Sequence, residues 1–182
     1  LALDDKRAAA LALNSLGIVV QGQGDLTAAW SLHQESLALQ REIGNKMGIA
    51  VSLNSLGLVA NDQCDYVAAR ALYEESLTLR REIGDKRGIS IALGNLGVLA
   101  QYQADYAAAR ALYETSLMLN RELGDMQGIA ILLLNLGELA MEQEDTMRAR
   151  ALYGESLTLC QEMGDKINMV CNLSGLAAVV AH

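Results

Sequence analysis

The chain has 182 residues, of which 52% are hydrophobic, with 16 Gly, no Pro and no Phe. The absence of Pro argues against a β-sandwich or barrel, whose turns rely on Gly and Pro together, and favours helices separated by Gly. The formal net charge of −8 argues against direct nucleic-acid binding, because phosphate backbones repel an acidic protein.

No membrane partner is expected, since the longest apolar stretches, such as 129–134, are far shorter than the roughly 20 residues of a spanning helix. Cys64, Cys160 and Cys171 form no C-x-x-C motif. Their odd number points to a reducing, cytoplasmic location and to small buried apolar side chains. The chain begins with Leu rather than Met, so we expect a fragment of a larger cytoplasmic signalling or regulatory protein.

A unit of 40 residues recurs along the chain, and each copy is predicted to form two helices. Apolar residues at helical spacing predict a first helix over 46–62 and a second over 66–83. Gly84 is expected to end that second helix in the left-handed conformation, with Asp85 as the next N-cap. The predicted helix pairs are about 5–43, 45–83, 85–123 and 125–163, followed by an unpaired helix at 165–182, in a single repeat array over 1–182.

A Leu-Gly pair marks the same position in four units: Leu16-Gly17, Leu56-Gly57, Leu96-Gly97 and Leu136-Gly137. An Asp follows each Gly by eight residues, an Ala by twelve and a Ser by 19. Self-similarity at such a period is typical of solenoids. The expected fold is all-α, a right-handed superhelical solenoid of antiparallel helix hairpins with about four and a half repeats.

Small residues are predicted to lie where helices touch, and charged residues to face solvent. Gly57 and Ser76 leave room for the two helices of a unit to approach, with Tyr73 filling the space beside them. Stretches such as 80–82 are predicted to be a solvated outer face. Two ion pairs at i,i+4 spacing are expected there, Arg70 with Glu74 and Arg110 with Glu114.

This pattern resembles the tetratricopeptide repeat family over essentially the whole chain. The Leu-Gly pair, the Ala twelve residues after the Gly, and the aromatic at Tyr73 match the family's arrangement. The unit of 40 residues exceeds the standard 34. It is similar to the repeats of Pins-type adaptors, of kinesin light chain, and of those attached to bacterial transcriptional activators and nucleotide cyclases. The family's frequent Pro is absent, and His33 takes the aromatic position in the first unit.

The resemblance implies a concave groove lined by the first helix of each pair, where a partner protein or peptide binds. The implied groove residues are Asn14, Ile18, Gln21, Asn54, Leu58, Asn61, Asn95, Val98, Gln101, Asn135 and Glu138, with Leu11, Val51, Ile91, Ile131 and Met141 beside them. Amides can hydrogen-bond a peptide backbone, and apolar side chains can take hydrophobic anchors. Each amide has a second interpretation, as a side chain satisfied by water or by the neighbouring repeat. None of these positions is Lys or Arg, which disfavours capture of an acidic C-terminus.

Catalysis, cofactors and metals are not expected. His33 and His182 are the only histidines, and neither has partners at ligand spacing. The leading hypothesis is therefore a protein–protein interaction module. Two alternatives stay open: a structural or self-associating oligomerisation scaffold, and a ligand- or peptide-sensing domain of a bacterial transcription regulator or cyclase. The last helix is strongly apolar, which raises the possibility of self-association through it.

Overall fold

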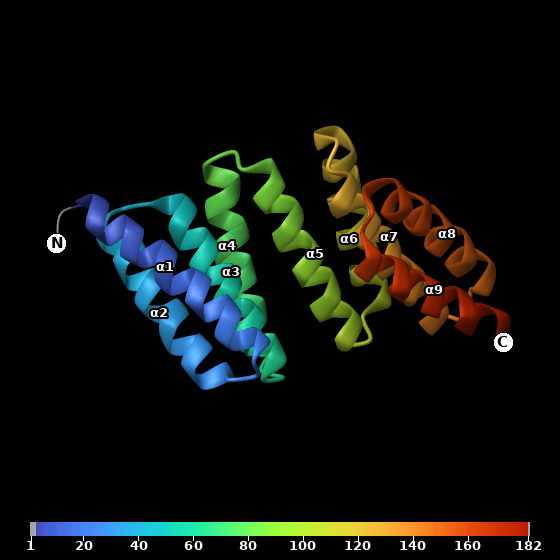
Figure 1. Ribbon diagram of the computed structural model, residues 1–182, viewed down its shortest axis with the longest axis horizontal. Coiled ribbons are helices and arrows are strands. Elements are labelled where there is room, and N and C mark those ends of the chain that lie inside the picture. The colour runs from blue at the N-terminus through green and yellow to red at the C-terminus, as the bar shows by residue number, and fades with distance from the viewer. Residues whose placement is uncertain (1–2, 182) are drawn as a thin grey trace. The chain divides into compact units, whose positions relative to one another are not determined.

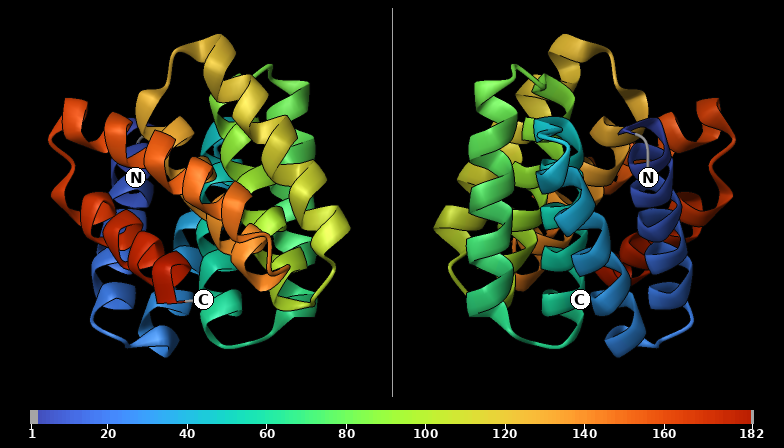
Figure 2. Two further views of the ribbon diagram at one scale, coloured as in Figure 1. Left: turned by 90° about the vertical axis from the view of Figure 1, so that its right-hand side faces the viewer. Right: turned by 90° about the vertical axis from the view of Figure 1, so that its left-hand side faces the viewer.

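The computed structural model describes residues 3–181, and every regular element in that range is an α-helix (Figures 1 and 2). The bounds are α1 Leu3–Gly22, α2 Leu26–Glu42, α3 Lys46–Asp62, α4 Tyr66–Glu82, α5 Lys86–Tyr102, α6 Tyr106–Leu123, α7 Met126–Glu142, α8 Thr146–Met163 and α9 Lys166–Ala181. The predicted all-α fold of sequential helix hairpins is confirmed, with four pairs and one further helix over these residues.

By its internal contacts the chain forms two compact units, Leu1–Asn95 and Leu96–His182. In the first unit α1 packs on α2, α2 on α3 and α3 on α4, and α1 also touches α3. In the second unit α6 packs on α7 and α7 on α8, while α9 contacts both α8 and α7. Within each unit, first helices of adjacent repeats are therefore neighbours.

The turns follow the predicted chemistry. Asp65 caps α4, because its Oδ1 accepts a hydrogen bond from the backbone N–H of Ala68 at 3.0 Å. Gly84 has a φ of +70°, the left-handed conformation expected after α4. The inner turn of each hairpin also needs positive φ, which Gly24 supplies in the first repeat but Cys64, Ala104 and Glu144 supply in the next three, at 61°, 57° and 59°. A residue with a Cβ is less stable than Gly in this left-handed conformation.

Within a hairpin, two recurring contacts fix the helix pair. A Cβ added to Gly57 would lie 2.5 Å from Cε1 of Tyr73, so the ring of α4 rests on the bare backbone of α3. Ser76 Oγ donates to the carbonyl of Ala50 at 2.7 Å. The same serine contact occurs from Ser36 to Ala10 and from Ser156 to Ala130, each at 2.8 Å. These small residues position the helices, as predicted.

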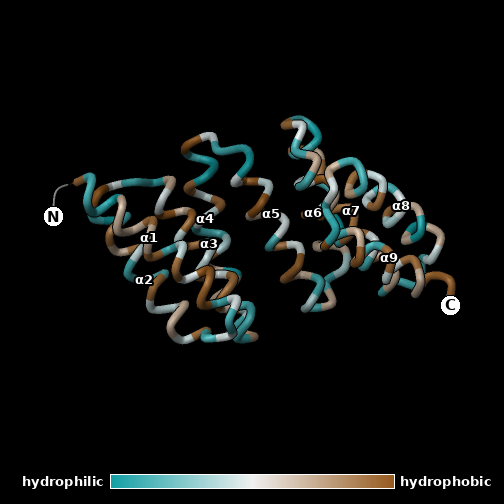
Figure 3. The backbone as a smooth tube through the Cα atoms, viewed as in Figure 1, coloured by the Kyte–Doolittle hydropathy of each residue, from teal (hydrophilic) through white to brown (hydrophobic). Residues whose placement is uncertain are grey.

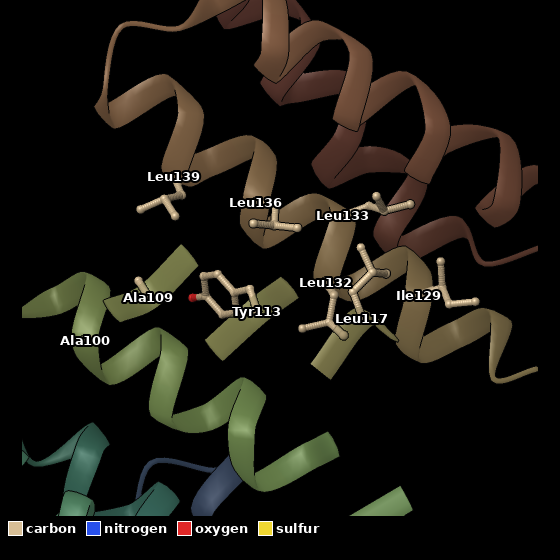
Figure 4. Packing of buried hydrophobic residues seen from close by; sticks show 9 residues of the cluster. All are labelled: Ala100, Ala109, Tyr113, Leu117, Ile129, Leu132, Leu133, Leu136 and Leu139. Carbon is tan, nitrogen blue, oxygen red and sulfur yellow. The ribbon is translucent and has the colours of Figure 1, made fainter. Parts of the chain in front are cut away.

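Leucines from facing helices fill the remaining space. Figure 4 shows one cluster of the second unit, in which Tyr113 and Leu117 of α6 lie against Leu132, Leu133 and Leu136 of α7. Hydrophobic and hydrophilic residues are interspersed along the helices of each unit, as amphipathic helices require (Figure 3).

Two predictions about charged residues were wrong. Arg80 was expected to be solvated but is 5% exposed, because its side chain turns inward beside Ser76. Glu114 pairs with Arg148 of α8 at 3.1 Å rather than with Arg110. The i,i+4 pair of Arg70 with Glu74 is present, at 4.0 Å.

Second helices are also joined by ion pairs that were not predicted from the sequence. Arg41 of α2 pairs with Glu75 of α4 at 3.0 Å, and Arg121 of α6 pairs with Glu155 of α8 at 3.2 Å. Each pair spans 34 residues, a separation that no single-helix rule covers.

The expectation that the cysteines are buried holds for one of them only. Cys160 is buried, whereas Cys64 and Cys171 are exposed. Cys64 occupies the turn between α3 and α4, and Cys171 lies on α9 at the position equivalent to the exposed Ile91 and Ile131.

Candidate functional site

Exposed apolar side chains lie along the first helices of the first unit. Leu11 on α1 is 58% exposed, and Ile18 on α1, Leu58 on α3 and Ile91 on α5 are also open to solvent. Since α1 and α3 are in contact, the side chains of Leu11, Ile18 and Leu58 belong to neighbouring helices. Here the apolar part of the predicted groove is available to a partner.

A small pocket of about 130 Å³ lies between α1 and α3. Its lining includes the predicted groove residues Leu11, Asn14 and Val51, together with the buried Ser36 and Gln40 of α2. A larger, more open depression of about 540 Å³ involves the turn before α3 rather than the groove positions.

Arg7 also lines the small pocket and is exposed. It precedes Leu11 by one helical turn, so both side chains lie on the same side of α1. No basic residue stands among the predicted groove positions, because each predicted groove begins with the residue equivalent to Leu11. The i,i+4 relation to Leu11 was the signal that could have found Arg7.

Most of the predicted amides bind neighbouring parts of the protein. Asn54 is buried, and its Oδ1 accepts a hydrogen bond from Asn95 Nδ2 at 2.9 Å. Gln21 Nε2 donates to Asp62 at 2.7 Å. Asn14 Oδ1 lies 3.0 Å from Nδ1 of His33. The contacts of Asn54 and Gln21 favour the interpretation in which amides are satisfied by the neighbouring repeat, whereas Asn14 is satisfied within its own hairpin.

The four asparagines do not share one helix position. Asn14 and Asn54 precede the Gly of their Leu-Gly pair by three residues, whereas Asn95 and Asn135 precede it by two. One residue turns an α-helix by about 100°, so the two pairs point in different directions. Asn54 is buried, whereas Asn14, Asn95 and Asn135 are half-buried, so burial does not follow this offset.

Asn61 is half-buried, and its Oδ1 has no hydrogen-bond partner among the described residues. In the second unit, Gln101 donates to Glu142 at 2.9 Å and accepts from Tyr113 at 2.9 Å. Val98 is half-buried against the leucine cluster of that unit. Gln101 and Val98 therefore contribute to the packing of the second unit at least as much as to the predicted groove surface.

The first-helix surface of the second unit is acidic. Glu138 is exposed as a residue, yet partial burial of its carboxyl, and then the neighbouring Glu142, raise the pKa of that group. Burial and the same two carboxylates raise the pKa of Tyr153 to about 12. Ile131 on this helix is exposed, and Met141 packs against the cluster around Tyr153.

Over residues 3–181, no group of three or more His, Cys, Asp or Glu side chains is placed to hold a metal ion. No helix in the described range is long and apolar enough to cross a membrane. His182 lies outside the described residues.

Comparison with known proteins identifies the repeat. The sequence model of the tetratricopeptide repeat matches residues 7–82 and again 48–122. No curated protein sequence is significantly similar to the chain.

Solved structures share the fold at low identity. BtubC (BKLC) from P. vanneervenii is 19% identical, with a TM-score of 0.79 over 98% of this chain and 83% of its own. Aspartyl phosphate phosphatase F from Bacillus subtilis is 10% identical, with a TM-score of 0.82 over 90% of this chain and 43% of its own. A putative kinesin light chain with nearly identical repeats from Podosopora anserina is 12% identical, with a TM-score of 0.72 over 92% of this chain and 83% of its own.

Proposed function

Because the chain belongs to the tetratricopeptide repeat family, whose repeats generally serve as protein–protein interaction modules, we propose that it binds a peptide segment of another protein along α1 and α3. The observation that carries this proposal is the group of exposed apolar side chains on these adjacent helices, Leu11, Ile18 and Leu58, beside the pocket of about 130 Å³. Exposed apolar side chains grouped in this way on a soluble protein mark binding surfaces.

The structure also supports a chemical class for the bound segment. An aliphatic side chain of the partner would enter the pocket beside Leu11 and Val51. Arg7, at the same pocket, would pair with a carboxylate of the partner. A segment that combines an aliphatic anchor with a nearby acidic residue therefore fits best. The helices that form this surface are held by hairpin contacts, so little entropy is lost on binding.

The amides have a smaller role in this proposal than the family resemblance implied. Asn54 and Asn95 are bonded to each other, and a peptide backbone would have to displace that bond. Replacing Asn54 would also leave the half-buried amide of Asn95 without its acceptor, so loss of binding in such a variant would be ambiguous. The apolar residues are the cleaner targets.

The test is selection of a random-peptide phage library on the purified chain, followed by affinity measurements on the selected peptides. A groove variant with Leu11→Ser, Ile18→Ser and Leu58→Ser should lose affinity by tenfold or more, about 1.4 kcal/mol. A control variant carries Val67→Ser and Met147→Ser, which alter exposed apolar residues of second helices; its affinity should be unchanged. Selected peptides that bind the groove variant as tightly as the native chain would refute the proposal.

A further inference from the structure

One face of α9 carries exposed apolar residues at Val170, Leu173, Ala177 and Val180, here called the α9 stripe. Val170 is 63% exposed, Leu173 52% and Val180 81%. The equivalent residues of α7, 40 positions earlier, are Ala130, Leu133 and Ala140, at 1%, 1% and 2%. In α7 that face is covered by α8, whereas in α9 no other helix of the same unit covers it (Figure 1).

The α9 stripe is not a simple copy of the face of α7. Gly137 of α7 receives the ring of Tyr153, and a Cβ there would lie 2.6 Å from that ring. The corresponding residue of α9 is Ala177, and valines replace the alanines at positions 170 and 180. A second helix with an aromatic residue at this point, like α4, α6 and α8, would therefore meet the Cβ of Ala177. The stripe suits a different partner.

The spacing of the stripe matches a coiled-coil seam. Its members are separated by three, four and three residues, the a and d positions of a heptad. If two α9 helices pair in antiparallel fashion about a two-fold axis, Leu173 of one copy faces Ala177 of the other. Val170 then faces Val180. A large residue thus meets a small one at the centre, and two valines meet at each end, so the side-chain sizes are complementary along the seam.

Charge also favours a second copy. The chain has a net charge of −8, yet no charged residue lies between Ile167 and Val180. Pairing of this face therefore removes no charged side chain from water. The two copies of the stripe also bring no like charges together. Lys166 begins α9, so in an antiparallel pair it would lie near the C-terminal end of the partner's α9, where the helix dipole favours a cation.

We propose that the α9 stripe binds the α9 stripe of a second copy of this chain, as an antiparallel, two-fold symmetric helix pair. A helix of 16 residues is about 24 Å long, so the contact is short and the dimer should be weak and reversible. The stripe belongs to α9, whereas Leu11, Ile18 and Leu58 belong to α1 and α3, so the dimer proposal uses different residues from the peptide-binding proposal and does not depend on it.

Sedimentation equilibrium over a range of protein concentrations tests the dimer. The native chain should shift from monomer to dimer as concentration rises, and Leu173→Asp should remain monomeric with unchanged helical circular dichroism. Val19→Asp is the matched control, because Val19 is an exposed apolar residue of α1, at 57%; it should dimerise as the native chain does. A native chain that stays monomeric, or a dimer broken by Val19→Asp but not by Leu173→Asp, would overturn the proposal.

Cysteine cross-linking tests the direction of the pair. Two variants, Leu173→Cys and Ala177→Cys, are prepared with the exposed Cys64 and Cys171 replaced by Ser, while the buried Cys160 is retained. Under mild oxidation, a mixture of the two variants should form the mixed disulfide in preference to either homodimer. Preferential homodimers of each variant alone would indicate a parallel pair and would refute the antiparallel arrangement.

Discussion

Arg80 Nη1 donates a hydrogen bond to Oδ2 of Asp85 at 2.8 Å, and both side chains are largely shielded from solvent. Nε of the same guanidinium donates to Ser76 Oγ at 3.1 Å. A Cβ on Gly88 would lie 1.6 Å from Nη1 of Arg80, so Gly88 leaves the space that the guanidinium occupies. The turn between α4 and α5 is thus built around one buried ion pair.

Removing one partner of this pair should be costly. Arg80→Ala leaves Asp85 shielded and unpaired, and we expect the free energy of unfolding to fall by about 3–5 kcal/mol. Urea denaturation followed by circular dichroism measures the change. Arg81→Ala is the matched control, since Arg81 is the exposed neighbour, and should change stability by less than about 0.5 kcal/mol. Equal effects of the two substitutions would show that the buried pair contributes nothing.

Two glycines of the second unit should respond in opposite directions to the same change. Gly137→Ala places a Cβ 2.6 Å from the ring of Tyr153, and the overpacking should destabilise the chain by about 1–3 kcal/mol. Gly154→Ala, within α8, meets nothing within 4 Å. It should stabilise by up to about 1 kcal/mol, because Ala is the better helix former. Thermal denaturation of the two variants decides this, and a stabilising Gly137→Ala would contradict the contact.

The inner turns offer a gain in stability. Cys64, Ala104 and Glu144 have positive φ without being Gly. Each change to Gly should raise the free energy of unfolding by about 0.5–1 kcal/mol, because relief of left-handed strain exceeds the entropy cost of Gly. The reverse change, Gly24→Ala at φ +87°, should destabilise. If Ala104→Gly lowers the melting temperature, the turn is not strained as described.

His33 should make the first hairpin sensitive to acid. Its side chain is fully buried, Nε2 has no hydrogen-bond partner among the described residues, and burial lowers the pKa of its imidazole below the ordinary 6.5. The unfolded chain therefore takes up a proton at a higher pH than the folded chain does. The neutral ring therefore contributes to the free energy of unfolding above about pH 6.5. As pH falls below 6.5, the free energy of unfolding decreases by up to about 1.4 kcal/mol per pH unit.

His33→Tyr provides the comparison for that prediction. Tyr is the residue at the equivalent positions 73, 113 and 153, where it rests on a Gly as His33 rests on Gly17. The variant should fold and should lose the His-dependent part of the pH profile between pH 7 and 5, measured by urea denaturation at each pH. Parallel profiles for the two proteins would show that His33 does not titrate on unfolding.

The sequence predicted the hairpins well because their defining contacts recur at fixed offsets within one repeat. Gly57 against Tyr73 recurs in the third and fourth repeats, and the bond of Ser76 to Ala50 recurs in the first and fourth, so both follow a pattern that is visible in the sequence. The groove was harder to predict, since Asn54 meets Asn95 only through the packing of neighbouring first helices. That contact spans 41 residues rather than the repeat length, and side-chain type alone did not reveal it.

Arg80 shows a second limit of predicting side-chain positions from the repeat pattern. Its sequence neighbours are charged, and residue type favours a solvated position. Its burial follows from the empty space at Gly88 and the carboxylate of Asp85, which belong to the next repeat. The equivalent polar residues Gln40 and Asn120 also lie over a Gly, at positions 48 and 128. At the last turn Cys160 is smaller, and Asn168 replaces the Gly.

The serine bond between Ser76 and the carbonyl of Ala50 joins residues 26 apart inside a single hairpin, as do its counterparts from Ser36 and Ser156. Unequal recombination between two copies of such a gene, at any matched point of the repeat, would yield a longer or shorter array in which every hairpin keeps its own serine, glycine and aromatic contacts. A change in the number of 40-residue units would therefore leave the contacts inside each remaining hairpin unchanged.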